Sequence, residues 1–180
     1  MAAIGKRAIG KRAIGKKTTG KAIGNSGQVK HSGSRRKARI FAFQALYFWE
    51  SNRVPVEELL TFAWVEEEKI KKLDDSLAAF SRSLIAGAVE NIKKIDKVIQ
   101  DHLENWDISR LNRVDLAVLR MSVYTLLFQD DIPPSIAIDE AIGICREYGT
   151  DDSFKFINGV LDSIRKTLQE KLNNNSQNKA

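Results

Sequence analysis

The sequence is poor in the residues that build redox, metal and disulfide chemistry. Its 180 residues include one cysteine, two histidines and three prolines. The single cysteine, Cys145, excludes an internal disulfide framework, and the absence of a CxxC motif or cysteine–histidine cluster argues against zinc. No run of 18 apolar residues and no signal-peptide core occurs. We therefore expect a soluble, cytoplasmic protein with no membrane span, metal or cofactor.

Acidic residues are missing from the first part of the chain, where Glu50 is the first to occur. Twelve lysines and arginines precede it, which leaves 17 of the 29 cations to face all 23 acids in the rest. An acidic body with a basic front end is typical of nucleic-acid binding. Charge alone fits an anionic lipid surface equally well.

The basic front end begins with a five-residue repeat, AIGKR at 3–7 and 8–12 and AIGKK at 13–17. Each unit carries one isoleucine and one glycine, too little for a core, and each glycine disfavours a helix by about 1 kcal/mol relative to alanine. We predict a disordered, basic, repetitive tail over residues 1–33 that holds phosphates loosely. A solubilising segment or a misassigned start explains the tail equally well.

Apolar residues recur at helical spacing from Ser34 onwards, and period-two alternation does not persist. The pattern predicts an all-α bundle of six to seven helices over residues 34–170, followed by a disordered polar tail over 171–180. The expected helices start at Ser34, Val56, Asp75 or Ser76, Ser109, Ser135, and Asp152 or Ser153. A further break is expected near 92–96, the second helix is expected to reach Val65, and Gly149 ends the fifth.

Converging polar groups of the kind that enzymes need are absent. His102 stands alone and is best interpreted as a surface or hydrogen-bonded side chain, and Cys145 as a small buried hydrophobe. Asp139 and Glu140 are adjacent in sequence, which places them on different faces of a helix. No HExxH, P-loop or GxSxG motif occurs. We therefore expect a binding protein and not an enzyme.

The densest positive charge, in "SRRKAR", lies at the start of the first predicted helix. Helix N-termini are already positive, so cations there are unfavourable unless an anion such as a phosphate backbone neutralises them. On the same helix Ile40, Phe43 and Tyr47 form a second apolar stripe beside the core face. The stripe indicates either a central helix buried on two sides or a surface for a protein partner.

Three segments resemble one known family. "DIPPSIAIDEAIGICREYGTDDSFKFINGVLD" at 131–162, "SRRKARIFAFQALYFWE" and "RVDLAVLRMSVYTLL" are similar, in this order, to motifs of the NusB family of bacterial transcription antitermination factors. The resemblance covers about residues 34–168. It implies two small helical subdomains without catalytic activity. It also implies binding of single-stranded boxA RNA together with NusE, a small-subunit ribosomal protein. The pair then joins RNA polymerase and other Nus factors in ribosomal RNA transcription.

The resemblance also implies roles for individual residues. Asn158 and Gly159 are interpreted as serving tight helix packing, and Thr125 stands where the family more often has an acidic residue. The residues expected to contact the partner are Tyr47, Asp115 and Asp152. Those expected to contact RNA are Arg35, Arg36, Lys37, Arg39, Gln44, Lys155 and Phe156.

Two other functions compete with this one. NusB-like domains also occur at the N-terminus of ribosomal RNA cytosine methyltransferases, and the short stretch after Leu168 leaves no room for a cofactor domain. The second alternative is a nonspecific nucleic-acid or membrane-surface protein driven by the basic tail. RNA binding by a chain without residues 1–33 separates the second alternative from a helix-borne site.

Overall fold

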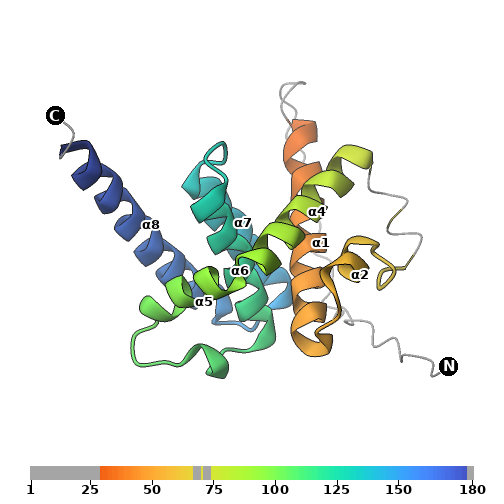
Figure 1. The fold of residues 1–180 in the computed structure, drawn as a ribbon, viewed down its shortest axis with the longest axis horizontal. Coiled ribbons are helices and arrows are strands. Elements are labelled where there is room, and N and C mark those ends of the chain that lie inside the picture. Colours follow the sequence, from red (N-terminus) through yellow and green to blue (C-terminus); the bar gives the residue numbers. More distant parts are fainter. Residues whose placement is uncertain (1–28, 67–69, 71–73, 178–180) are drawn as a thin grey trace, which may run out of the picture.

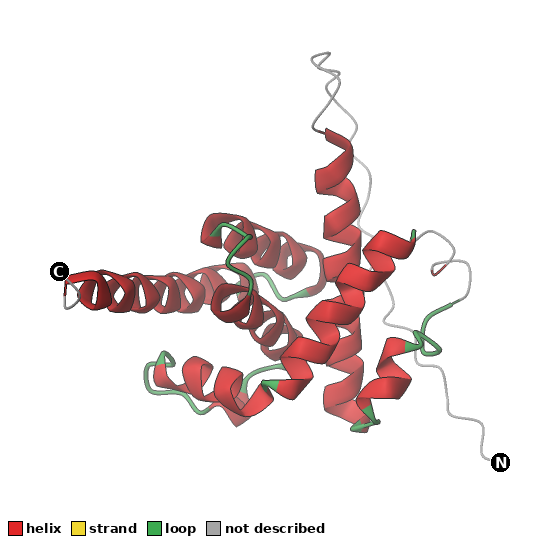
Figure 2. Cartoon of the chain, turned by 45° about the horizontal axis from the view of Figure 1, so that its top comes forward, coloured by secondary structure: helices red, strands yellow, loops and turns green. Residues whose placement is uncertain are grey.

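The computed structural model describes residues 29–66, 70 and 74–177, and within these ranges the secondary structure is entirely helical (Figure 2). Seven α-helices and one short 3-10 helix are present there, which confirms the predicted all-α bundle. Of the tail predicted over 1–33, residues 1–28 lie outside the described part of the chain. The elements are α1 (Val29–Asn52), α2 (Val56–Leu60), α4 (Asp75–Glu90), α5 (Ile92–Asp101), η1 (Ile108–Arg110), α6 (Arg113–Phe128), α7 (Pro134–Tyr148) and α8 (Ser153–Gln177).

Helix α1 is the central element of the bundle. It packs against α4 on one side and α6 on the other, while α2 lies against α4 and α7 lies between α6 and α8 (Figure 1). Phe43 of the second apolar stripe is fully buried, and its ring lies 5.3 Å from that of Tyr148. Most of this stripe therefore serves packing, because α1 is covered on two sides.

The core joins all the long helices around α1. Its members are apolar side chains with little or no exposed surface, at the three- and four-residue spacing seen in the sequence. The largest of them are Phe43, Phe62, Leu46, Leu59, Leu84, Ile85, Ile95, Ile99, Leu119, Ile144, Ile157 and Leu161. The C-terminal half of α8 extends away from this core (Figures 1 and 2).

Several predicted boundaries are confirmed. The helix that begins at Asp75 ends at Glu90, and α5 starts at Ile92, where the sequence predicted a break. Helix α7 starts at Pro134, one residue before the predicted Ser135, because proline is well suited to the first helical position, where its missing N–H costs nothing. Gly149 ends α7, and a Cβ there would crowd the Cys145 carbonyl oxygen at 2.7 Å. A glycine is therefore required for the chain to turn from α7 towards α8.

Other boundaries were predicted wrongly. Helix α1 begins at Val29 and not at Ser34, and α8 continues to Gln177, past the predicted end at 170. The second helix stops at Leu60 because Phe62 adopts a left-handed conformation, with φ of 58°. Ser109 lies in η1, and the residue that caps α6 is Asn112.

Candidate nucleic-acid interface

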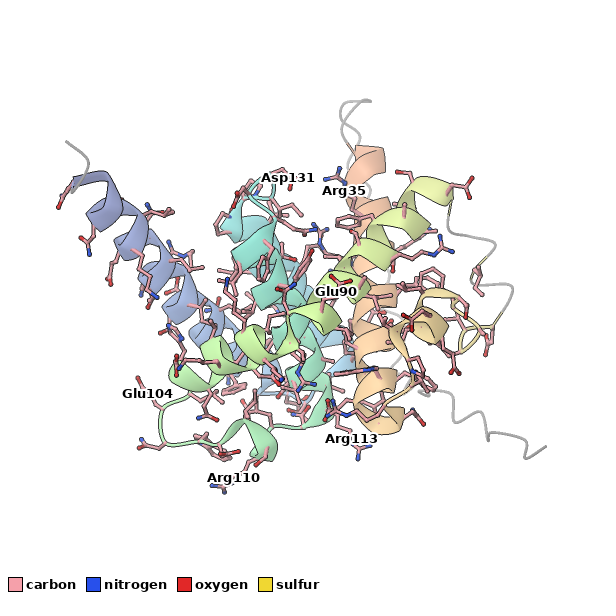
Figure 3. The ribbon with its side chains drawn as sticks, in the orientation of Figure 1. Arg35, Glu90, Glu104, Arg110, Arg113 and Asp131 are labelled. Atoms are coloured by element: carbon pink, nitrogen blue, oxygen red, sulfur yellow. The ribbon has the colours of Figure 1, made fainter. Side chains whose placement is uncertain are left out.

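The four cations at the start of α1 do not form one surface. Successive residues of a helix are rotated by about 100°, so neighbours in sequence point in different directions. Arg35 and Lys37 are exposed, Arg36 is half-buried, and Arg39 is only 5% exposed. Figure 3 shows Arg35 extending from the end of α1. Two of the four predicted contacts are therefore freely accessible to an anion.

Arg39 lies inside the bundle, contrary to the prediction that it contacts RNA. Its Nη1 is 3.8 Å from Oε1 of Glu140 on α7, and its guanidinium lies 5.5 Å from the centre of the Phe80 ring on α4. Burial lowers the pKa of Arg39, an effect that the Glu140 carboxylate opposes. Arg39 therefore links α1 to two other helices.

Arg36 is held by two carboxylates of α7. Its Nη1 donates to Oε2 of Glu140 at 3.3 Å, and its Nη2 lies 3.5 Å from Oε2 of Glu147. Its side chain is still 34% exposed. Arg36 is thus at the surface but already paired with an internal anion.

Arg35 and Lys37 are differently placed. The Arg35 guanidinium lies 5.6 Å from the centre of the Phe80 ring, so Phe80 has Arg35 and Arg39 as neighbours. Such a cation–aromatic contact limits the mobility of Arg35 without neutralising it. Arg35 and Lys37 have no carboxylate partner among the described residues. These two side chains therefore provide unneutralised positive charge.

A hollow of about 390 Å³ lies at the other end of α1. It is formed where the last turns of α1, the start of α6 and the end of α7 meet. Tyr47 is half-buried at this site, and Arg113 donates from Nη1 to Oγ of Ser51 at 2.9 Å. The hollow is therefore formed by three separate segments of the chain. Its lining residues, which we call the Tyr47 pocket, are Tyr47, Asn112, Arg113, Val114, Tyr148, Gly149 and Thr150.

Sequence reasoning found only Tyr47 of this pocket as a site residue. Tyr148 and Gly149 were seen as the end of a helix, and Asn112 was not recognised as a cap. The usable signal was the aromatic–glycine turn in "EYGT", whose place in the fold depends on how α7 packs.

Asp115 lies behind the pocket and not on the surface, contrary to the prediction. It is 5% exposed and forms a reciprocal cap with Asn112: its N–H donates to Asn112 Oδ1 at 2.9 Å, and its Oδ2 accepts from Asn112 Nδ2 at 2.6 Å. Asp115 therefore fixes the start of α6, which together with its cap Asn112 supplies three residues of the Tyr47 pocket. Its Oδ1 is buried and has no hydrogen-bond partner among the described residues.

Asp152 and Lys155 lie at the beginning of α8, close in sequence to the pocket residue Thr150. Both are exposed, and Lys155 Nζ is 3.1 Å from Asp152 Oδ1. The turn between the pocket and α8 is fixed by Ser153, whose Oγ accepts from the Thr150 N–H at 3.0 Å. Phe156 is half-buried one turn into the helix. The predicted partner residue Asp152 therefore does not line the Tyr47 pocket but follows the lining residue Thr150 by two positions.

The predicted RNA contact Gln44 lies elsewhere on α1, and the interpretation of Gly159 is wrong. Gln44 is half-buried on α1 between the exposed cations and the Tyr47 pocket. Asn158 and Gly159 are both exposed, and a Cβ on Gly159 would meet nothing within 4 Å. Gly159 therefore does not serve tight helix packing.

The remaining polar candidates have structural explanations. His102 Nδ1 lies 2.8 Å from the Val98 carbonyl oxygen and Nε2 lies 3.1 Å from Thr167 Oγ1, so the ring is hydrogen-bonded as predicted. Cys145 is fully buried, and burial raises the pKa of its thiol to about 12. Across the described ranges, no group of three or more histidine, cysteine or carboxylate residues is placed to hold a metal. None of the helices described is long and apolar enough to cross a bilayer.

The fold is thus all-helical, with exposed cations at one end of its central helix and a pocket at the other end. Residues 36–166 match the model of the NusB family, and the chain belongs to this family. It is 52% identical to the transcription antitermination protein NusB of Treponema denticola over 134 residues, which are 74% of this chain and 97% of the relative. Transcription antitermination is therefore its function, and the expectation that it is not an enzyme is confirmed.

Solved structures agree with this assignment. The chain resembles NusB of T. maritima with a TM-score of 0.67 and 41% identity, covering 73% of this chain and 90% of that one. It also resembles a crystal structure of the antitermination factors NusB and NusE in complex with double-stranded RNA. There the TM-score is 0.67 and the identity 30%, over 75% of this chain and 98% of the other.

Proposed function

We propose that this chain acts in antitermination by binding single-stranded boxA RNA and the ribosomal protein NusE at the same time. The observation that carries the proposal is the arrangement of α1, which presents unneutralised Arg35 and Lys37 near its start and the Tyr47 pocket near its end. A similar structure holds NusB, NusE and RNA in one complex. The proposed place of action is the cytoplasm, with RNA polymerase and other Nus factors.

The RNA surface consists of charge and of groups that contact bases. Arg35 and Lys37 supply attraction to phosphates, and the planar Arg35 guanidinium also suits stacking on an unpaired base. Residues 35 and 47 are separated by about 18 Å along the helix at 1.5 Å per residue. Gln44 lies between them, and Lys155 and Phe156 lie beyond the pocket. An extended RNA strand is long enough to follow α1 and reach both groups.

The partner surface consists of the Tyr47 pocket and the adjoining start of α8. Tyrosine at the edge of a pocket is a common binding hot spot, because it buries a large ring and keeps a polar hydroxyl. Asp152 adds an exposed negative charge beside the pocket. Arg39 and Asp115 contribute indirectly, since they position α1 and α6.

The deciding experiment measures RNA binding by the full chain with and without purified NusE. The two RNAs have the same composition, one with the boxA element and one with its bases scrambled. We expect NusE to strengthen binding of boxA much more than binding of the scrambled strand. Equal affinities for both RNAs, with or without NusE, would favour nonspecific binding by the basic tail.

A further inference from the structure

Arg36 contacts one face of α7 through two carboxylates and one glycine. Glu140, Gly143 and Glu147 recur at intervals of three and four residues, so they share one side of the helix. The guanidinium lies across this side, with ion pairs of 3.3 Å to Glu140 and 3.5 Å to Glu147. These contacts join α1 to α7 although the paired residues are more than 100 positions apart in the sequence.

Gly143 provides the space for this contact. A Cβ at position 143 would overlap Nη1 of Arg36 and lie 3.1 Å from its Nη2 and 3.2 Å from its Cζ. Glycine is unfavourable inside a helix, so its presence calls for a close approach of this kind. The obstructed group is the far end of a flexible side chain, which can move away without disturbing the backbone.

The ion pairs of Arg36 are easy to break. Both are longer than a good charge-assisted hydrogen bond, and the Arg36 and Glu147 side chains are 34% and 42% exposed. An exposed ion pair such as Arg36–Glu147 changes an equilibrium constant by less than about fivefold, whereas the Glu140 side chain is only 15% exposed. When Arg36 leaves, Glu140 keeps Arg39 as a neighbour at 3.8 Å, and Glu147 is solvated by water. Release therefore leaves no buried charge alone.

We propose that α7 holds Arg36 in reserve, with Glu140 and Glu147 as internal competitors of RNA phosphates. When RNA binds at Arg35 and Lys37, a phosphate replaces the carboxylates and Arg36 becomes a third contact. The strength of the internal pairs thus sets the RNA affinity of the site. This inference rests on the proposed function, because it concerns the same RNA surface.

The first test combines Glu147→Gln with Arg36→Ala in a double-mutant cycle. The probe is a boxA-containing single strand without NusE. Asp139→Asn is the matched control, since it removes one exposed negative charge from the same helix on a different face. We expect E147Q to raise RNA affinity by up to about fivefold, D139N to raise it less, and the extra gain of E147Q to vanish when Arg36 is absent.

The second test uses Gly143→Ala, which leaves the net charge unchanged. The new methyl group displaces the guanidinium from α7, so RNA affinity should rise although no charge has been altered. Arg36→Ala should lower affinity and reduce the slope of log K against log salt by about 0.7, the value for one charge on a single strand. Melting curves of each variant without RNA establish that the fold is intact.

The possible results separate the inference from the function on which it rests. The reserve role of Arg36 is overturned if the wild-type chain binds RNA and E147Q behaves like D139N, or if R36A leaves affinity and salt dependence unchanged. In the latter case Arg36 only ties α1 to α7. If the wild-type chain binds neither the boxA strand nor the scrambled strand, with or without NusE, the proposed function fails, and the reserve role fails with it.

Discussion

The Arg120 guanidinium on α6 donates two parallel hydrogen bonds of 2.8 Å to the Asp96 carboxylate on α5. It also pairs with Glu50 from α1, so one side chain connects three helices. Arg120 is 5% exposed. Burial lowers the pKa of Arg120, but the hydrogen bonds to Asp96 and Glu50 outweigh this and the pKa is raised. This network fixes the C-terminal end of α1 and thereby the position of Tyr47.

We expect Arg120→Ala to destabilise the fold by about 3–5 kcal/mol, since it leaves two carboxylates without their shared cation in a partly buried site. Denaturant unfolding measures the loss. Arg110→Ala is the control, because Arg110 is exposed and its removal should cost less than about 1 kcal/mol. Similar losses for both variants would show that the network does not hold the bundle together.

The exposed cations of α1 should dominate the salt dependence of RNA binding. Replacing Arg35 and Lys37 together by alanine should lower affinity and reduce the salt slope by about 1.4, at about 0.7 per charge. Arg110 and Lys166 form the matched control pair, and Arg110 lies at the end of the molecule opposite Arg35 (Figure 3). Titrations at several salt concentrations give the slopes. Equal slopes for the two double variants would contradict the assignment.

The Tyr47 pocket should govern NusE binding. Tyr47→Ala should weaken NusE affinity by about 2 kcal/mol or more, as expected for a hot-spot ring. Asp152→Lys should weaken it while leaving the melting temperature nearly unchanged, because Asp152 is exposed. Asp139→Lys reverses an exposed charge on α7 and serves as the control. Calorimetry with purified NusE provides the affinities, and unchanged binding by both pocket variants would place the interface elsewhere.

Two helical glycines should respond to alanine in opposite directions. Gly159 faces open space, so Gly159→Ala should stabilise the fold by about 0.5–1 kcal/mol through helix propensity. A Cβ at Gly87 would overlap the Tyr124 ring, so Gly87→Ala should destabilise by about 1–3 kcal/mol. Thermal or urea unfolding distinguishes the two. Destabilisation by Gly159→Ala would mean that its surroundings are closed.

The buried thiol predicts a loss of stability in alkali. Burial, with a smaller contribution from the Asp115 carboxylate, raises the pKa of Cys145 from 9.0 to about 12. The unfolded chain therefore releases this proton between pH 9 and 12 while the folded chain keeps it, so stability falls as the pH rises through that range. Cys145→Ala should make the fall shallower, though Tyr148, whose pKa is also raised to about 12, keeps part of it. Urea unfolding across this range tests the expectation, and identical curves would refute it.

The sequence predicted the helices well because their signals are local. Apolar spacing, the two prolines at the start of α7 and Gly149 at its end each act within a few residues. The predicted start of α6 was wrong because Ser109 and Asn112 both suit a cap, and the packing of η1 decides between them. The predicted start of α1 was wrong for a similar reason. Serine is favoured as a helix cap, but it does not have to be one, and the helix begins before Ser34.

The candidate site was less predictable because it depends on distant partners. Nothing in "SRRKAR" tells Arg39 from Arg35. Both lie against the Phe80 ring, and only the packing of α1 against α7, which brings Glu140 beside Arg39, distinguishes the buried arginine from the exposed one. The Tyr47 pocket likewise combines three segments that come together only in the folded chain. The chemical character of the side chains at these positions was therefore known from the sequence, whereas their exposure was not.

Because α1 is packed on two sides, insertions and deletions near Arg35 are restricted. Arg35 and Lys37 face outward there, and Ala38 and Arg39, which follow them, face inward. Inserting or deleting one residue after position 35 would rotate everything before it by about 100° relative to the bundle. RNA binding and packing thus depend on the same helical register of α1. Insertions and deletions are tolerable only before Arg35.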